Sequence, residues 1–518
     1  MPANNGKPTI LALADDLRMN SGVATMMREL VLSTVHKFNW VELAGAITHP
    51  DKGNAYDLSQ STNELKNIKD AYVKLYPTDG YGNEQMLFQI IAMEKPHAIF
   101  HFTDPRFWGW LYSIEKQIRS NIPLVYLNIW DSIPYPMYNR PFYESCDALF
   151  SISKQTMNIN KYVMGPKNCC YVGDGPMNGR TLLQYCPHGI DSDIFKPLDQ
   201  LDKNDKEYKE FSEFKKRVFG GKEYKFIILY NSRNVHRKRT SNIILAYRQF
   251  CDNLPKEEAQ KCALILHTEI MQDMGTNLLA VKEAFCPDYP IIFSPGKLSP
   301  QDMCKLYNIA DVTVNASSSE GFGLSCAESI MSGTPVTVTV TGGLQDQIGQ
   351  LDNMGKPVEF DADFGSNNIG RYKNHGPWAY PVWPVTRLVQ GSIPTPYIFD
   401  DLTKWEDFSE GFMYWYMMGD KKRTILGAEG RRWALNEGGI NSKNMGQTFI
   451  DGMEYVFKNW TKPKRFSIHT VKDYVGNTMF EGHSGITFDK IDKEAVQKKI
   501  DQWSLWFTDK PTPVTRYP

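Results

Sequence analysis

SSSEGFGLSCAESIMSGTPV, residues 317–336, lies at the junction of two short apolar runs, 312–315 and 335–340, that predict buried parallel strands. Between them, residues 324–331 have helical spacing. A glycine-bearing turn that leads from a parallel strand into a helix exposes backbone N–H groups at the positive end of that helix, which suits a phosphate. The stretch therefore predicts an α/β fold with an anion site at this turn.

Four residues in this stretch are candidates for ligand contact. Gly321 and Gly323 allow the backbone to approach a ligand closely. Glu320 lies in the predicted turn and Glu328 in the predicted helix, so the two carboxylates can contact different parts of one ligand. For either glutamate alone, a solvated position at a helix start, favoured by the helix dipole, is the simpler interpretation.

The alternation of strands and helices extends in both directions from this stretch. Further predicted strands lie at residues 9–14, 41–47, 98–102, 124–129, 148–152, 226–230, 263–267 and 291–293. Predicted helices lie at residues 23–37, 83–93, 241–251, 275–284 and 300–309. Because parallel sheets arise from this alternation, we expect two doubly wound, Rossmann-like domains.

Composition shifts set the predicted domain boundaries. Residues 1–198 form the first domain, the highly charged residues 199–222 a linker, and residues 223–445 the second domain. Residues 350–398 are rich in Gly, Pro and aromatics and are interpreted as a functional insertion, because aromatic content argues against disorder. Residues 446–518 are expected to be helices and a tail that pack back on the first domain.

Overall composition argues against several classes of protein. The chain has 518 residues, is 42% hydrophobic, and carries 58 Lys and Arg against 59 Asp and Glu, so no global field attracts nucleic acid or an anionic membrane. No apolar window approaches the roughly 20 residues needed to span a bilayer, and the N-terminus lacks a secretory signal pattern. Nine scattered cysteines without zinc-ligand spacing favour reduced thiols and no structural metal. We therefore expect a cytoplasmic protein.

EGFGLSCAE, residues 320–328, resembles the paired-glutamate (EX7E) signature of the retaining glycosyltransferases of family 4, or group 1, and their GT-B relatives. The similarity extends over residues 306–336 and to Gly342 and Gly343. It implies GT-B architecture, two Rossmann-like domains that face a central cleft. It also implies that Glu320 contacts the transferred sugar and that Glu328 binds the ribose.

The same resemblance implies which residues contact the diphosphate of a sugar nucleotide. It places Phe322, Gly323 and Leu324 against the diphosphate through their backbone. In NSRNVHRKRTSNIILAYRQF, residues 231–250, Arg233 and Lys238 occupy the positions where the family holds an Arg and a Lys on the diphosphate. Such a pair would neutralise the charge that develops on the leaving group.

Other basic and cleft residues have less specific assignments. Arg237 and Arg239 are interpreted as solvated surface, which is the usual environment of a run of basic residues. The loop NSGVATMM, residues 20–27, places Gly22 where the family's glycine-rich loop faces the donor phosphates. Lys297 and Leu298 follow a predicted strand and are expected to contact the nucleobase.

The acceptor side departs from the family pattern. In LNIWDSIPYP, residues 127–136, Trp130 occupies the place where relatives often carry a His. Asp131, directly after it, and His101, near the end of another predicted strand, are the alternative candidates for lining the cleft and taking part in catalysis. His188, in CPHGIDSDIF, residues 186–195, is interpreted as structural.

These residues lead to three functional hypotheses. The resemblance implies retaining transfer of a hexose or pentose from a nucleotide-diphosphate sugar to an unidentified hydroxyl of a glycan, lipid or small molecule, without metal or other cofactor. The first alternative is a viral-type DNA base glycosyltransferase acting on hydroxymethylated bases. Its candidate basic patch comprises Arg371, Lys373, His375, Lys462, Lys464 and Arg465. The second alternative is a non-catalytic sugar-nucleotide binding module.

Overall fold

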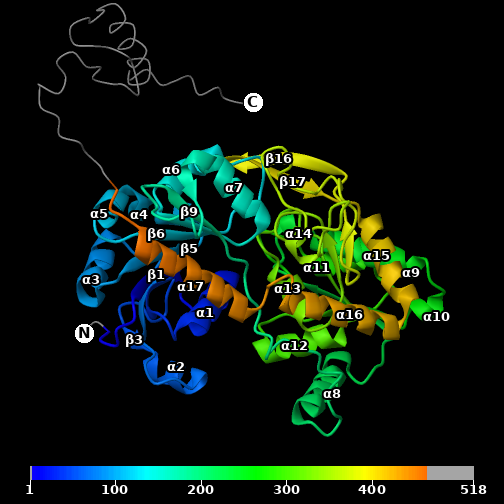
Figure 1. Ribbon diagram of the computed structural model, residues 1–518. Coiled ribbons are helices and arrows are strands. Elements are labelled where there is room, and N and C mark those ends of the chain that lie inside the picture. Colours follow the sequence, from blue (N-terminus) through cyan, green and yellow to red (C-terminus); the bar gives the residue numbers. More distant parts are fainter. Residues whose placement is uncertain (1–2, 464–518) are drawn as a thin grey trace, which may run out of the picture. The chain divides into compact units, whose positions relative to one another are not determined.

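The computed structural model describes residues 3–463, and residues 3–462 belong to one structural unit (Figure 1). Two parallel α/β sheets organise this unit. The first has nine strands in the order β3-β4-β2-β1-β5-β6-β7-β9-β8, and the second has six in the order β12-β11-β10-β13-β14-β15. The prediction of two doubly wound sheets is confirmed.

The first sheet is parallel except at β3, which pairs antiparallel with β4. Its strands are β1 (Thr9–Asp15), β2 (Asn39–Ala46), β3 (Tyr56–Asp57), β4 (Val73–Asp79), β5 (Ala98–Phe102), β6 (Leu124–Asn128), β7 (Ala148–Ser151), β8 (Cys169–Cys170) and β9 (Thr181–Tyr185). Its helices are α1 (Gly22–Thr34), α2 (Ser59–Lys66), α3 (Glu84–Glu94), α4 (Gly109–Ser113), α5 (Glu115–Ile118), α6 (Arg140–Glu144) and α7 (Lys154–Met164). Strands β4 and β9 were not predicted from the sequence.

The second sheet is parallel throughout. Its strands are β10 (Phe226–Asn231), β11 (Cys262–His267), β12 (Ile291–Phe293), β13 (Val312–Asn315), β14 (Val336–Thr339) and β15 (Ala379–Val382). Its helices are α9 (Thr240–Asp252), α10 (Lys256–Ala259), α11 (Leu278–Phe285), α12 (Pro300–Ile309), α13 (Leu324–Met331), α14 (Leu344–Gln347), α15 (Trp405–Met418) and α16 (Asp420–Leu435). The predicted strands and the helices at 300–309 and 324–331 agree closely with these bounds.

Local signals explain where the helices begin. The Ser21 side chain accepts a hydrogen bond from the Ala24 N–H and caps α1, and Ser299 caps α12 with Pro300 at the first helical position. Helix α1 then buries Met26, Met27, Leu30 and Val31 on one face. These caps fix the two helices that lead from strand ends near the candidate site.

The predicted linker, residues 199–222, contains a packed helix, α8 (Lys206–Phe219). Asp205 caps it, and Phe211, Phe214 and Phe219 are buried. Three phenylalanines on one face give this charged segment the pattern of an amphipathic helix. The domain boundaries themselves stay predictions.

The predicted insertion, residues 350–398, contributes structure to the second half. It contains edge strand β15 and most of an antiparallel hairpin, β16 (Thr386–Ser392) and β17 (Thr395–Leu402). Hydrogen bonds from the hairpin to the first half include Tyr138 Oη to the Tyr397 carbonyl at 2.8 Å and the Phe399 N–H to the Ile133 carbonyl at 2.8 Å. The hairpin therefore contacts both halves of the unit.

The chain returns to the first half through α17 (Ser442–Asn459), which runs alongside α1 (Figure 1). Phe449 of α17 stacks on Trp40 of β2 at 5.7 Å between ring centroids and meets Phe100 of β5 edge-on at 5.2 Å. Aromatic packing thus attaches α17 to the first sheet. The remainder of the predicted tail, residues 464–518, lies outside the described residues.

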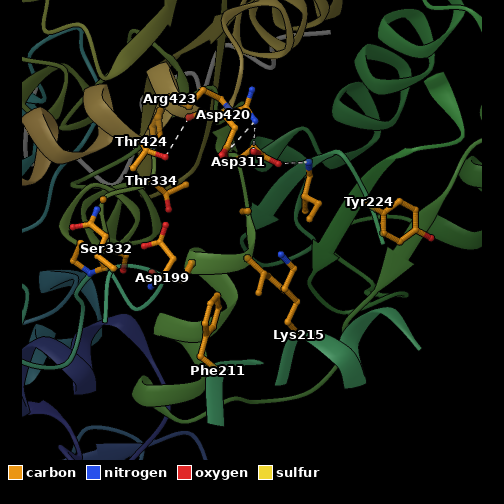
Figure 2. A pocket seen from close by; sticks show the side chains of 18 of the residues that line it. Asp199, Phe211, Lys215, Tyr224, Asp311, Ser332, Thr334, Asp420, Arg423 and Thr424 are labelled. Atoms are coloured by element: carbon orange, nitrogen blue, oxygen red, sulfur yellow. Dashed lines mark hydrogen bonds and ion pairs between the residues drawn. The ribbon is translucent and has the colours of Figure 1, made fainter. Parts of the chain in front are cut away.

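A buried ion pair lies where strands of the second sheet begin, beside a cavity of about 450 Å³ (Figure 2). Arg423 of α16 contacts Asp311, which precedes β13, and their side chains are 6% and 16% exposed. Asp311 also accepts a hydrogen bond from the Ile227 N–H of β10 at 2.7 Å. The pair therefore connects α16 to two central strands.

We expect Arg423→Ala to lower the free energy of unfolding by about 3 kcal/mol, because it leaves the Asp311 carboxylate buried without its cation. Chemical denaturation followed by circular dichroism measures the loss. Arg248→Ala is the matched control, since Arg248 and Asp252 form an ion pair with side chains 50% and 47% exposed. The control should lose less than about 1 kcal/mol, and equal losses in both variants would contradict the assignment.

Candidate active site

Two loops at the carboxyl ends of neighbouring strands form the centre of the candidate site. One loop follows β10 and the other follows β13, and the two strands pair in parallel. The Ser318 N–H donates to the Arg237 carbonyl at 2.8 Å, and Arg237 Nη1 donates to the Ser319 carbonyl at 2.7 Å. Ligand sites of parallel α/β sheets lie at this edge of the sheet. The two motifs of the sequence therefore meet in space.

An ion pair between Lys238 and Glu320 occupies this junction. Lys238 is buried at the end of a short 3-10 helix, His236–Lys238, and Ser317 Oγ also donates to Glu320 at 3.2 Å. Burial alone would raise the pKa of Glu320, but the Lys238 ammonium and the Arg237 guanidinium lower it below the usual value. Glu320 is therefore a carboxylate at neutral pH, and burial lowers the pKa of Lys238.

Glycines bring two backbone segments, residues 320–323 and 342–344, together around Glu320. Gly323 has φ of 95°, and a Cβ added there would lie 2.4 Å from Leu344. A Cβ on Gly342 would lie 2.0 Å from the Glu320 carbonyl oxygen, which accepts from the Gly343 N–H at 2.8 Å. Only glycine fits such contacts. They fix the turn that precedes α13.

Helix α13 begins at this turn with its positive end next to Glu320. Its N-cap is Gly323, and among the described residues no side chain caps it. Gln347 instead donates to the Phe322 carbonyl at 2.6 Å, which holds the turn from the carbonyl side. The first backbone N–H groups of the helix form a suitable site for an anion.

Glu328 lies one turn further into α13 and belongs to a separate polar network. Tyr307 Oη donates to Glu328 at 2.7 Å, and Asn231 Nδ2 donates to Tyr307 Oη at 2.7 Å. Burial raises the pKa of Glu328 to about 7. Glu320 and Glu328 thus differ in ionisation near neutral pH although they lie in one motif.

Strand ends of the first half lie against the same turn. A Cβ on Gly22 would meet Leu324 at 3.5 Å, and one on Gly321 would lie 3.2 Å from the Ile129 carbonyl and 3.9 Å from the Cβ of Asp131. Burial alone would lower the pKa of Arg237, but the negative charges of Glu320 and Asp131 raise it. Asp131 is therefore within electrostatic range of the ion pair.

The structure brings together most, but not all, of the sequence-predicted residues. Those at the junction are Gly22, Asp131, Lys238, Glu320, Gly321, Phe322, Gly323, Leu324 and Glu328. The side chain of Arg233 is exposed and makes no hydrogen bond or ion pair within residues 3–463. Lys297 is exposed and Leu298 packs on the core, both after β12 at the same sheet edge. Their predicted contacts to a donor stay predictions.

The prediction that His101 lines the cleft is wrong. His101 is 0% exposed and stacks on Tyr126 at 4.9 Å between ring centroids, while Tyr112 Oη contacts its Nδ1 at 3.1 Å. Strand β5 is central in the first sheet, so its side chains are covered on both faces. Burial lowers the pKa of His101 to about 3. The residue is a structural part of the first core.

Sequence reasoning missed two charged residues of the site. Arg237 is exposed, as predicted, but its Nη1 also donates to the Ser319 carbonyl in the loop that carries Glu320. Asp400 of β17 is buried, contacts Arg239 at 3.5 Å and has a pKa raised by burial. The next residue, Asp401, donates its N–H to the Ser318 carbonyl at 2.9 Å. No local pattern marks these roles, because Arg237 depends on the neighbouring Ser319 loop and Asp400 depends on the hairpin lying against Arg239.

Comparisons with known proteins agree with this geometry. Residues 211–356 match the family model described as glycosyl transferases group 1, and these residues are a group 1 glycosyltransferase domain. The match contains both loops of the candidate site and ends before the hairpin β16–β17. No curated protein in the comparison matches the chain.

Solved structures show the same fold across the described chain. A glycosyltransferase from Rickettsia africae is 14% identical over 87% of this chain and 99% of its own, with a TM-score of 0.56. Anabaena HepE in complex with UDP-glucose is 13% identical over 86% and 99%, with a TM-score of 0.56. Sucrose-phosphate synthase from Thermosynechococcus elongatus is 13% identical over 87% and 99%, with a TM-score of 0.58. The chain has the GT-B fold.

No helix within residues 3–463 combines the length and apolarity that crossing a membrane requires. No group of three or more His, Cys, Asp or Glu side chains in the same part of the chain is arranged to hold a metal ion.

The raised pKa of Glu328 predicts a pH-dependent stability effect. The folded pKa of Glu328, about 7, exceeds its usual value of 4.5, so the stability that its neutral form contributes is full below pH 4.5 and is lost as pH rises to about 7. Glu328→Gln should therefore gain stability relative to the unmodified protein as pH rises from 5 to 8, by about 2 kcal/mol. Thermal unfolding of both proteins across this range measures the difference, and a difference independent of pH would contradict the raised pKa.

Proposed function

We propose that the protein is a retaining glycosyltransferase that transfers a sugar from a nucleotide-diphosphate sugar to a hydroxyl acceptor. The observation that carries the proposal is the buried Lys238–Glu320 pair at the start of α13, with Arg237 and Asp131 beside it. Cations, a helix N-terminus and a carboxylate meet within one turn. This combination fits a sugar diphosphate, which is anionic at one end and rich in hydroxyls at the other.

The donor would bind with its diphosphate at the start of α13. Backbone N–H groups there, with Lys238 and Arg233, would bind the phosphate oxygens, and Glu328 would accept hydrogen bonds from the ribose. Lys297 and Leu298 would contact the base. HepE, a structure with the same fold, was solved with UDP-glucose, which supports a UDP-sugar as the first donor to test.

The chemical step follows from these positions. The bond between the sugar's anomeric carbon and the diphosphate breaks, and the acceptor oxygen bonds to that carbon on the same face. The acceptor's proton passes to the departing phosphate oxygen, so no carboxylate nucleophile is required, in contrast to retaining glycosidases. Lys238 is held in place by Glu320 before charge develops on the leaving group, which is electrostatic preorganisation.

We expect Lys238→Ala to lower kcat by about 100-fold or more, because the leaving diphosphate loses a preorganised cation. Glu320→Gln should also lower kcat strongly, since it removes the charge that faces the sugar and holds Lys238. Release of UDP from UDP-glucose, with and without acceptor mixtures, measures turnover. Lys261→Ala, which removes an exposed ion pair with Glu258, is the control and should retain full activity.

Both active-site variants should remain folded by circular dichroism. Normal turnover in Glu320→Gln, or unfolding of that variant, would count against the assigned role.

The proposed reaction needs no bound metal, because basic side chains and a helix terminus supply the positive charge that a divalent ion would otherwise supply. Turnover in excess EDTA should therefore equal turnover in buffer. A loss restored by added Mg²⁺ or Mn²⁺ would show that the protein groups do not suffice.

Observations in the described residues do not favour the two alternatives. Arg371 lies over the Phe364 ring at 4.9 Å and Lys373 over the Trp383 ring at 3.8 Å, so both exposed cations of the predicted patch already contact aromatic rings. The predicted patch residues Lys464 and Arg465 lie outside the described residues. A non-catalytic binding module would not require the Lys238–Glu320 pair at the sugar end of the site.

A further inference from the structure

A second cavity lies away from the candidate active site, against the edge strand β15 and helix α15. Its volume is about 560 Å³, within the range of small-molecule pockets. The residues that line it include six with charged or aromatic side chains: Lys373, Tyr380, Trp383, Asp407, Glu410 and Tyr414. None of them is a residue assigned to the donor site, and all follow the group 1 match at 211–356. The cavity therefore belongs to a part of the chain with no assigned role.

One face of α15 supplies three of these six side chains. Asp407, Glu410 and Tyr414 stand three and four residues apart, so they share a face of the helix. Tyr414 meets Tyr380 of β15 with ring centroids 5.3 Å apart and is 43% exposed. The cavity thus has aromatic surface on both of its walls.

The polar groups of the cavity have unused hydrogen-bonding capacity. Trp383 Nε1 is shielded from water and has no hydrogen-bond partner within residues 3–463. Asp407 and Glu410 form no ion pair in that same part of the chain, and burial followed by the Glu410 charge raises the pKa of Asp407. Glu410 is exposed and Asp407 is partly exposed, so water reaches both carboxylates, whereas the Trp383 N–H is a shielded donor of the kind that normally finds a partner.

The hydrogen-bond donors and acceptors that line the cavity indicate which class of ligand it can bind. Carboxylates accept hydrogen bonds only, whereas the Trp383 N–H and the Lys373 ammonium donate only. Sugar hydroxyls both donate and accept, and the C–H faces of sugar rings pack on aromatic rings. A cationic ligand would use the carboxylates but would be repelled by Lys373, which already lies over the Trp383 ring. We propose that this cavity is a second, non-catalytic carbohydrate-binding site.

Binding of the fluorescently labelled full-length protein to an array of neutral oligosaccharides tests the proposal. We expect the unmodified protein to bind at least one glycan. Tyr414→Ala and Glu410→Gln should each weaken that binding about tenfold, since one removes an aromatic wall and the other a charged acceptor. Tyr162→Ala is the matched control, because Tyr162 is 44% exposed and does not line the cavity.

The variant Lys238→Ala separates this site from the proposed active site. Glycan binding should be unchanged in it even where sugar transfer is lost, so failure of the proposed function leaves this test intact. Three results would overturn the proposal: no array glycan bound by the unmodified protein, undiminished binding in both Tyr414→Ala and Glu410→Gln, or loss of binding in Lys238→Ala. Binding of tetramethylammonium in place of any glycan would assign the cavity to a cation instead.

Discussion

The ion pair between Lys238 and Glu320 is the interaction on which the candidate site depends. Each residue comes from a loop after a different strand, and the two loops are joined by backbone hydrogen bonds as well as by this pair. Removing either charge would leave the other buried and unpaired, which is costly in a protein interior. The same contact that stabilises the junction also aligns a cation with the start of α13. Structure and proposed chemistry therefore depend on one arrangement of charges.

The rest of the second half holds that junction in place. Glycines at 323 and 342 allow the backbone of the turn to pack against neighbouring segments, and Gln347 holds its carbonyls. Glu328 is anchored apart from Glu320 through Tyr307 and Asn231. The two glutamates of one short motif thus have different surroundings, and burial moves the pKa of one toward neutrality while nearby cations lower that of the other. A sequence motif alone cannot distinguish these two states.

Most of the fold was predictable because apolar runs and helical spacing are local signals. The turn at residues 320–323 and the strands around it followed from the sequence with correct bounds. Other features depend on distant contacts. His101 follows the pattern of a strand-end residue, but β5 is central and covers it. Arg237 belongs to a basic run, and only the neighbouring Ser319 loop gives it a role. Helix α8 was hidden by its charge, although its phenylalanines have helical spacing.

The hairpin β16–β17 makes several of its connections through main-chain atoms, besides the side-chain contacts of Tyr397, Asp400 and Asp401. The N–H groups of Asp401 and Phe399 and the carbonyl of Tyr397 make the hydrogen bonds that reach Ser318, Ile133 and Tyr138. Backbone groups are the same in every residue except proline. Exposed positions of the hairpin such as Val389 and Ile393 can therefore change in sequence without breaking these main-chain bonds.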